Sequence, residues 1–322
     1  MALNFLGVDI GGTKTHALIA DESGRVLGFG ERGPGNHQSV GYAGMRKVLH
    51  AATAQALAGA GLSISQIAAA GFGIAGYDWP SQKEAMLVAI RSLGLQAPIE
   101  IVNDASLGIL AGCSQGWGVA VVSGTGCNAR GWDRGRRHEG RAIGEGDLAG
   151  EGAGASELMA MAIKAVSHEW TCRGPATMLT PMLVERYRAR NLADLVEGFA
   201  TNRLDLDPAD APLVFKAAGL GDPVALDLVR WAGSELGKLA NGVICQLGFH
   251  DLEFDVVLVG SMYDGNPLLI ETMQSTIRSI APRASLVRLT APPVVGAVLL
   301  AMEQAGFSSD GQVRENLSRT IG

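Results

Sequence analysis

The order in which strand-like and helical segments follow one another most restricts the fold of this chain. Three short apolar segments come first, then a helix, and then strand, helix, strand and helix, all within residues 1–111. The same order starts again with strand-like segments at 118–123, 128–132 and 136–143. Such a repeat of architecture indicates two units of one design. The sequence therefore predicts an α/β fold of two βββαβαβα domains.

Turn residues and the spacing of apolar residues set the bounds of these elements. In the first unit the expected strands are residues 3–9, 15–20, 26–31, 69–74 and 99–102, and the expected helices are about 40–57, 80–93 and 103–111. In the second unit a helical insertion at about 154–248 precedes strands 256–259 and 284–287 and helices 267–281 and 294–304. We expect domains at 1–111 and 112–322, and the last helix, from about 293, could pack back on the first.

Composition and charge exclude several classes of protein. Hydrophobic residues make up 47% and charged residues 18% of the 322 residues, which is typical of a large folded core. The net charge of −6, without a strongly basic face, argues against a nucleic-acid partner. No apolar segment has the ~18–20 residues of a membrane helix, and the N-terminus reads as a strand rather than a signal peptide. The four cysteines form no CxxC pair, so we expect a cytoplasmic protein without disulfides or zinc.

A glycine turn joins the first two expected strands, in the segment VDIGGTKT at residues 8–15. Because Gly11 and Gly12 have no Cβ, the backbone N–H groups of the turn can approach phosphate oxygens closely. Thr13 and Thr15 can add hydroxyl donors, and Lys14 can add a positive charge toward the terminal phosphates. The segment predicts a phosphate-binding hairpin, although it is also compatible with an ordinary tight turn.

The acidic residue before this turn suits a magnesium ion. Asp9 ends the first expected strand. Mg²⁺ prefers oxygen ligands and keeps most of its water, so one carboxylate can hold it through a water molecule. We therefore predict Asp9 as the metal-binding residue.

A second glycine turn, Ser123-Gly124-Thr125-Gly126, follows the first expected strand of the second unit. It offers the same chemistry as the first turn, with backbone donors at Gly124 and Gly126 and a hydroxyl at Thr125. A dinucleotide-binding motif is disfavoured here, because such a motif opens a helix and residues 128–132 read as a strand. The two turns together predict a two-sided clamp for ATP.

A candidate general base lies between the two turns in the sequence. Asp104 ends a buried strand and opens a helix, in the segment IVNDA at residues 101–105. The carboxylate could cap the helix, or it could face the cleft and accept a proton from a hydroxyl. Because the neighbouring strands end in glycine-rich loops at the same edge, the cleft position is favoured. A base there would orient the hydroxyl oxygen for attack on the phosphate.

These segments together resemble the BadF/BadG/BcrA/BcrD ATPase family, and within it the N-acetylglucosamine and glucosamine kinases. The resemblance covers nearly the whole chain and implies actin-like (ribonuclease H-like) domains around a nucleotide cleft. The matching segments, in the same order, are GVDIGGTKT at 7–15, GPGNHQSVG at 33–41, GFGIAG at 71–76, IVNDA at 101–105, VVSGTGCNARGW at 121–132, VVLVGS at 256–261 and PPVVGAVLLA at 292–301.

The resemblance also implies roles for single residues. Asp104 matches the catalytic aspartate, and Gly260 and Ser261 are expected near the adenosine. Asn36 matches an asparagine that contacts the sugar, although on its own it could simply shape a turn after Pro34-Gly35. The expected sugar-binding residues are Asn36, His37, Gly76, Asn103, Asp104, Cys127, Asn128, Gly144 and Glu151.

One segment departs from the pattern of the family. The family usually has GWG and then GDEGS, whose aspartate binds sugar hydroxyls, whereas residues 144–154 read GEGDLAGEGAG. The tryptophan is missing, and Glu151 could replace the aspartate or align with the glutamate beside it. Cys127 stands where serine is usual, and a thiol is a poor hydrogen-bond donor.

The expected activity is ATP- and Mg²⁺-dependent phosphorylation of a hydroxyl, the 6-OH, of an amino sugar such as N-acetylglucosamine or glucosamine. Family precedent implies a homodimer. The first alternative is an ATPase that activates a radical dehydratase through a [4Fe–4S] cluster, which needs two suitable cysteines per subunit. The second is a non-catalytic sugar or nucleotide sensor, which would not need Asp9, Lys14 and Asp104 together.

Overall fold

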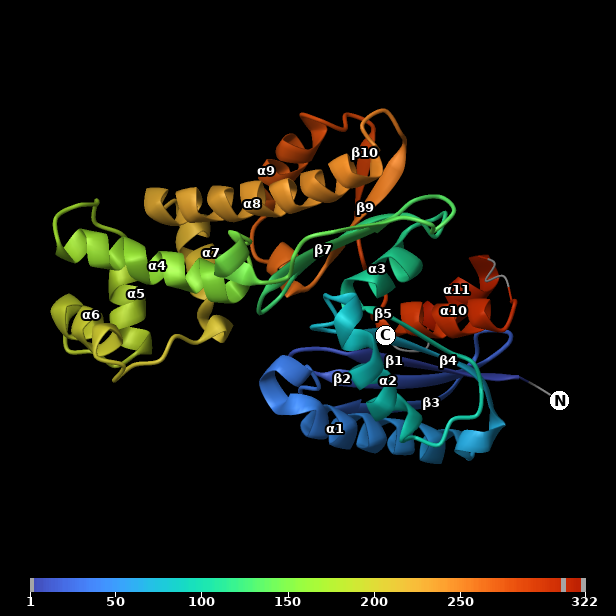
Figure 1. The fold of residues 1–322 in the computed structure, drawn as a ribbon. Helices are drawn as coiled ribbons and strands as arrows, with labels where there is room; N and C mark the ends of the chain where they lie inside the picture. The colour runs from blue at the N-terminus through green and yellow to red at the C-terminus, as the bar shows by residue number, and fades with distance from the viewer. Residues whose placement is uncertain (1–2, 308–310, 320–322) are drawn as a thin grey trace.

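The computed structural model describes residues 3–307 and 311–319, which form two α/β units with a five-stranded sheet each (Figure 1). The first sheet has the order β3-β2-β1-β4-β5. Its first three strands are antiparallel, whereas β4 runs parallel to β1 and β5 runs parallel to β4. The strands are β1 (Asn4–Ile10), β2 (Thr15–Asp21), β3 (Val26–Arg32), β4 (Ile67–Ile74) and β5 (Ile99–Asn103).

The second sheet repeats this arrangement. Its order is β10-β9-β6-β7-β8, with antiparallel pairing among β6, β7 and β8 and parallel pairing among β6, β9 and β10. The strands are β6 (Gly118–Ser123), β7 (Cys127–Trp132), β8 (Glu139–Arg141), β9 (Phe254–Val259) and β10 (Ala284–Arg288). The predicted α/β fold with two units of the same order is therefore confirmed.

The helices connect the strands as expected, and the helical insertion lies between β8 and β9. In the first unit they are α1 (His37–Ala60), η1 (Ile64–Gln66), η2 (Pro80–Gln82), α2 (Lys83–Arg91) and α3 (Asp104–Gly112). In the second they are η3 (Gly146–Ala149), α4 (Ala155–Trp170), α5 (Leu179–Arg186), α6 (Leu192–Ala200), η4 (Pro208–Asp210), α7 (Pro212–Gly219), α8 (Pro223–Leu247), η5 (Ser261–Asp264), α9 (Pro267–Arg278), α10 (Val294–Gln304) and α11 (Gly311–Arg319). None of the helices in the described part of the chain is long and apolar enough to span a membrane.

Some bounds differ from the expected ones for local reasons. Helix α1 begins at His37, three residues before the expected start, because Asn36 caps it; its backbone then breaks at Gly41, where φ is 67°. The expected helix at 80–93 is divided into η2 and α2. The third strand of the second unit is only three residues long, since the rest of 136–143 forms loops on either side. Helix α11 is not predicted by the sequence pattern.

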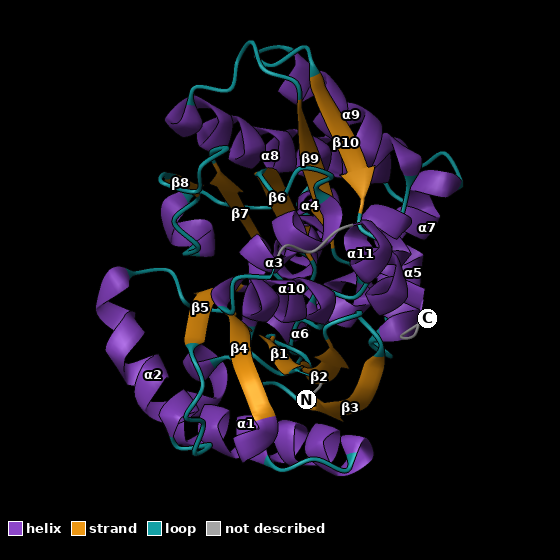
Figure 2. Ribbon diagram, turned by 90° about the vertical axis from the view of Figure 1, so that its right-hand side faces the viewer, coloured by secondary structure: helices purple, strands orange, loops and turns teal. Residues whose placement is uncertain are grey.

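Helices α3 and α10 each pack on the sheet of the other unit. Helix α10 contacts β1 and β4, α3 contacts β6, β7 and β9, and the two helices contact each other. Figure 2 shows α3 and α10 between the two sheets. Glycine permits the close approach of α10, because a Cβ at Gly7 would lie 2.4 Å from the backbone nitrogen of Val298. The two units are therefore interlocked beside the cleft that separates them.

Candidate active site in the cleft between the two units

The two glycine turns meet across the cleft. The Oγ1 atoms of Thr13 and Thr125 lie 3.4 Å apart, although the two residues belong to different units. A Cβ placed on Gly12, Gly124 or Gly126 would meet no heavy atom within 4 Å. The backbone of both turns is thus uncovered on the side that faces the cleft, as a phosphate-binding surface requires.

Most of the predicted site residues line this one cleft, whose volume is about 510 Å³. They are Gly11, Gly12, Thr13, Lys14, Asn36, Gly76, Asp104, Gly124, Thr125, Gly126, Cys127, Asn128, Gly144, Gly260 and Ser261. Five other predicted residues lie beside the cleft without lining it, namely Asp9, Thr15, His37, Asn103 and Glu151.

Asp104 lines the cleft beside the residue that caps α3, and its own Oδ1 also accepts a hydrogen bond from the Ala105 nitrogen at 3.0 Å. The side chain of Asn103 is the N-cap of α3 and accepts a hydrogen bond from the Ala105 nitrogen at 3.0 Å. Burial, and then the negative charge of Asp78, raise the pKa of Asp104 to about 6. A carboxylate with that pKa is ionised at neutral pH and is still basic enough to accept a proton.

Asp9 is a second carboxylate close to Asp104. Burial, and then the charge of Asp104, raise the pKa of Asp9 to about 8. The repulsion between the two carboxylates would be relieved by a cation, and oxygen ligands suit Mg²⁺. Among the described residues, no group of three or more His, Cys, Asp or Glu side chains could hold a metal by itself. The residues therefore fit a Mg²⁺ that takes its remaining ligands from phosphate and water.

Two residues of the first turn are placed differently from the expectation. The Lys14 ammonium, 59% exposed, forms an ion pair with Glu31 at 3.4 Å. The Thr15 hydroxyl is fully buried and has no hydrogen-bond partner among the described residues; a Cβ on Gly35 would lie 2.6 Å from it. Thr15 therefore belongs to the core beneath the turn, and its side chain is not available to a phosphate.

Asn36 both caps a helix and lines the cleft. Its Oδ1 accepts a hydrogen bond from the Gln38 nitrogen at 2.9 Å. Gly76, at φ 79°, lies against it, since a Cβ there would be 2.7 Å from Asn36 Oδ1. His37 stacks on Tyr42 with 4.6 Å between ring centroids, and burial lowers the pKa of His37. His37 is therefore packed against Tyr42 and does not line the cleft.

Glu151 does not point its carboxylate into the cleft, contrary to the prediction of a sugar contact. The side chain is buried and accepts hydrogen bonds from three consecutive backbone nitrogens, those of Ile143, Gly144 and Glu145, at 2.5, 2.7 and 3.0 Å. A carboxylate with three such donors has its acceptor capacity largely filled. Glu151 therefore fixes the loop that brings Gly144 to the cleft.

A polar network that sequence patterns do not predict lies beside Asn128 and Gly144 in the cleft. Asp78, 4% exposed, follows β4, and its Oδ1 accepts a hydrogen bond at 2.7 Å from Arg130 Nη2 in β7. Arg130 is 1% exposed, so the ion pair is buried, and it joins the two units. Asn103 and Asn128 also donate to Oδ1, at 3.2 and 3.5 Å. The only signal was a single aspartate just after the GFGIAG segment, because an arginine within a strand pattern does not indicate its own burial.

At the other end, the cleft continues into a recess of about 830 Å³. The recess is lined by Thr13, Thr125 and Ser261 and by apolar side chains of the helical insertion, including Phe215. Gly260 connects β9 to this region at φ 108°, and a Cβ there would lie 2.1 Å from the Ser123 carbonyl oxygen. The recess can accept a flat apolar group attached to phosphates that lie on the two turns.

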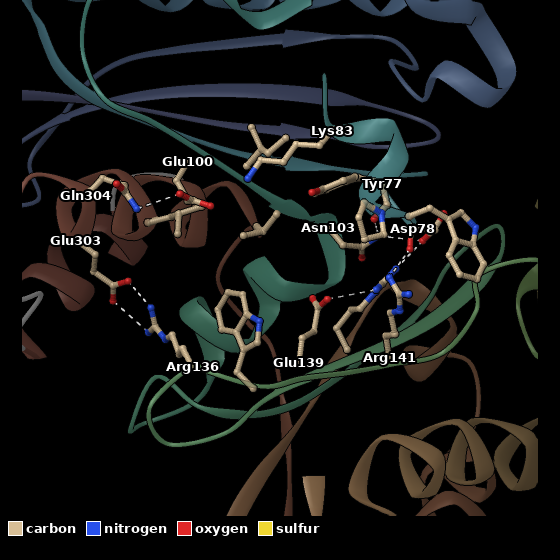
Figure 3. A pocket seen from close by; sticks show the side chains of 17 residues that line it. Tyr77, Asp78, Lys83, Glu100, Asn103, Arg136, Glu139, Arg141, Glu303 and Gln304 are labelled. Atoms are coloured by element: carbon tan, nitrogen blue, oxygen red, sulfur yellow. Dashed lines mark hydrogen bonds and ion pairs between the residues drawn. The ribbon is translucent and has the colours of Figure 1, made fainter. Parts of the chain in front are cut away.

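A separate cavity of about 440 Å³ lies on the far side of Asp78 and Asn103, again between the two units. Figure 3 shows Lys83 and Tyr77 on one wall and Glu139 on the opposite wall. Arg136 and Glu303 form an ion pair at its other end. Asp78 thus separates this rear cavity from the cleft.

Comparisons with known proteins agree with this geometry. The sequence profile of the BadF/BadG/BcrA/BcrD ATPase family matches residues 6–301. The chain is 26% identical to the N-acetylmuramic acid/N-acetylglucosamine kinase of Clostridium acetobutylicum, over 93% of this chain and 98% of that protein. It is 27% identical to the N-acetyl-D-glucosamine kinase of Dictyostelium discoideum, over 92% of this chain and 97% of that protein.

Two solved structures have the same fold. One is an N-acetylglucosamine kinase candidate from Chromobacterium violaceum, with a TM-score of 0.71 and 23% identity, covering 92% of this chain and 98% of that one. The other is a ROK family glucokinase from Streptomyces griseus, with a TM-score of 0.59 and 21% identity, covering 94% of this chain and 100% of that one.

Proposed function

This chain belongs to the BadF/BadG/BcrA/BcrD ATPase family, and from that premise we propose that it is an ATP-dependent kinase that phosphorylates a hydroxyl of an amino sugar. The observation that carries the proposal is the convergence of both glycine turns and Asp104 on one cleft. Relatives named as N-acetylglucosamine kinases, matched along more than nine-tenths of their length, support the class of substrate.

The nucleotide would lie along the two turns. The uncovered backbone at Gly12, Gly124 and Gly126 can donate to phosphate oxygens, and Thr13 and Thr125 add hydroxyl groups from opposite sides. The recess beside Ser261 and Phe215 has room for the adenosine. When bound at Asp9, Mg²⁺ would neutralise charge on the phosphates. Because each turn belongs to a different unit, the position of the phosphates depends on how far the cleft is closed.

The sugar would lie at the other end, between Asn36, Gly76, Asn128 and Gly144. Asp104 would accept the proton of the 6-OH and orient its oxygen toward the terminal phosphate. The closed cleft would exclude water, which competes with the sugar as phosphate acceptor. We propose N-acetylglucosamine or glucosamine as the substrate.

A coupled assay of ADP release tests the proposal, with glucosamine, N-acetylglucosamine, N-acetylmannosamine and glucose at saturating ATP and Mg²⁺. We expect turnover with at least one of the amino sugars, and mass spectrometry should find one phosphate added to it. No turnover with any of the four sugars would overturn the assignment. Binding of ATP and sugar without turnover would indicate a sensor instead.

The alternative of an activator ATPase requires a separate measurement. An activator ATPase would carry an iron–sulfur cluster, visible as absorbance near ~400 nm after anaerobic purification. All four cysteines are free, and Cys113 is buried whereas Cys172 and Cys245 are exposed. We expect no such band.

A further inference from the structure

The geometry points to Asp78 as a second substrate-binding carboxylate, which accepts a hydrogen bond from a ring hydroxyl of the sugar other than the one that is phosphorylated. This inference rests on the proposed function and deepens it, because it names a residue that selects the acceptor. Arg130 is the corresponding positioning residue, since it would act only through Asp78.

The position of the Asp78 carboxylate suits contact with a ligand in the cleft. Asp78 lines the cleft together with Asn128 and Gly144, at the end away from the nucleotide recess. A Cβ on Gly144 would lie 2.8 Å from Asp78 Oδ1 and 3.3 Å from Oδ2. Any larger residue at 144 would therefore cover the carboxylate. The glycine leaves it open toward the space in which the sugar is expected.

Only one of the two Asp78 carboxylate oxygens accepts hydrogen bonds from the described residues. Arg130, Asn103 and Asn128 all donate to Oδ1, at 2.7, 3.2 and 3.5 Å. Within residues 3–307 and 311–319, none of the hydrogen bonds to this carboxylate ends on Oδ2. A carboxylate can accept through both oxygens, so Oδ2 keeps its capacity for a ligand hydroxyl. The anchored Oδ1 holds the group in one orientation, which lowers the entropic cost of binding.

A purely structural role does not account for the whole arrangement around Asp78. Glu139 also lies near Arg130, with 3.8 Å between its Oε2 and Nη1, and it faces the rear cavity. Asp78 instead accepts hydrogen bonds from side-chain amides of both units. It also lines both the cleft and the rear cavity. A counter-ion for Arg130 would not need this position in the cleft wall.

Glu151, predicted from the sequence as a sugar-binding carboxylate, is already occupied by backbone hydrogen bonds. The Glu151 carboxylate is occupied by the backbone nitrogens of residues 143–145, so it cannot also bind a sugar hydroxyl with full strength. The same contacts hold Gly144 against Asp78. The loop thus supports a different carboxylate, from the other unit, at the sugar end of the cleft.

Since Asp104 would take the hydroxyl that is phosphorylated, Asp78 would take the hydroxyl at position 3 or 4 of the ring. A site that binds a hydroxyl through a buried carboxylate rejects the analogue that lacks it, because the carboxylate is then left without a partner. We expect wild-type kcat/KM to fall roughly 10- to 100-fold for either the 3-deoxy or the 4-deoxy analogue of the preferred sugar.

The decisive experiment combines Asp78→Asn with these analogues. Because Arg130 donates at the Oδ1 position, the amide oxygen of the new asparagine should occupy that position. The amide nitrogen then takes the place of Oδ2, so a hydrogen-bond donor replaces the free acceptor. The KM for the sugar should rise roughly 10- to 100-fold while the KM for ATP stays unchanged. The variant should no longer discriminate against the deoxy analogue that wild type rejects. Glu139→Gln, the matched control beside Arg130, should change neither KM nor discrimination.

The outcomes separate this inference from the proposed function. If wild type phosphorylates none of the sugars, the proposed function fails. If it phosphorylates one but accepts both deoxy analogues within about threefold, or if Asp78→Asn keeps the sugar KM and the discrimination, the inference on Asp78 is overturned. Should Asp78→Asn not fold because Arg130 is left unpaired, the double variant Asp78→Asn/Arg130→Gln removes both charges, and the wild-type analogue series remains decisive.

Discussion

The two ends of the cleft are built in different ways. At the proposed nucleotide end the surface is the backbone of two glycine turns, one from each unit, and these turns meet at Thr13 and Thr125. At the proposed sugar end the lining includes polar side chains from both units, beside the buried pair of Asp78 and Arg130. A phosphate needs several donors on a short curved segment, whereas a sugar needs separate groups around a ring.

This difference determines which substitutions should weaken binding at each end. Where the backbone makes the contact, adding a methyl group to a glycine is the most damaging change. Where side chains make it, removing a charge is the most damaging change. In the proposed reaction, phosphate transfer would occur where the two ends meet, at Asp104. The predictions below test this division, from the largest expected effect to the smallest.

The largest effect is expected for Asp104→Asn, at the junction of the two ends. An amide cannot accept the proton of the sugar hydroxyl, so kcat should fall roughly 10²- to 10⁴-fold. Single-turnover kinetics would measure the rate of phosphate transfer, and a separate titration would measure the affinity for ATP. ATP affinity should be nearly unchanged; a kcat near the wild-type value would remove Asp104 from the role of base.

Gly260→Ala tests the nucleotide end. The new methyl group would lie 2.1 Å from the Ser123 carbonyl oxygen, at a backbone φ of 108° that alanine rarely adopts. We expect a loss of about 3 kcal/mol in the free energy of unfolding and weaker binding of ATP. Denaturant unfolding and ATP titration measure both. Gly12→Ala is the matched control for stability, because its methyl group meets no atom within 4 Å; it should weaken ATP binding only.

Glu151→Gln tests the loop at the sugar end. The amide nitrogen would replace one oxygen that accepts backbone N–H bonds, so the loop at 143–145 should loosen. The expected loss is about 1–3 kcal/mol in the free energy of unfolding, with a several-fold rise in the KM for the sugar. Glu145→Gln, in the same loop, should change neither the free energy of unfolding nor the KM for the sugar. A rise in the KM for ATP alone would contradict the assignment of Glu151 to the sugar end.

The smallest effect is a shift in pH dependence. Because the base must be ionised, kcat/KM should fall as the pH drops below about 6, the value to which burial and Asp78 raise the pKa of Asp104. Asp78→Asn removes one of these causes, so the acidic limb of the profile should move to lower pH. A limb that stays in place would mean that Asp78 does not act electrostatically on the base.

The same division explains what could be predicted from the sequence. The nucleotide end was accessible because each turn is a contiguous segment with its own glycines. The sugar end was not, because its geometry depends on long-range contacts. Asp78 and Arg130 are 52 residues apart. Asn103 and Asp104 both accept a hydrogen bond from the Ala105 nitrogen, and only the structure shows that Asp104 is the one that lines the cleft. Glu151 has the right charge at nearly the right place, but the backbone takes up its carboxylate.

The exchange of α3 and α10 between the units has a consequence for synthesis on the ribosome. The first sheet is complete after residue 103, yet the helix that covers β1 and β4 is α10, Val294–Gln304. The N-terminal half therefore leaves the ribosome with one apolar face of its sheet exposed. That face is covered only after nearly the whole chain has been synthesised. Neither half is expected to persist alone as a fragment, and both should unfold in a single cooperative transition.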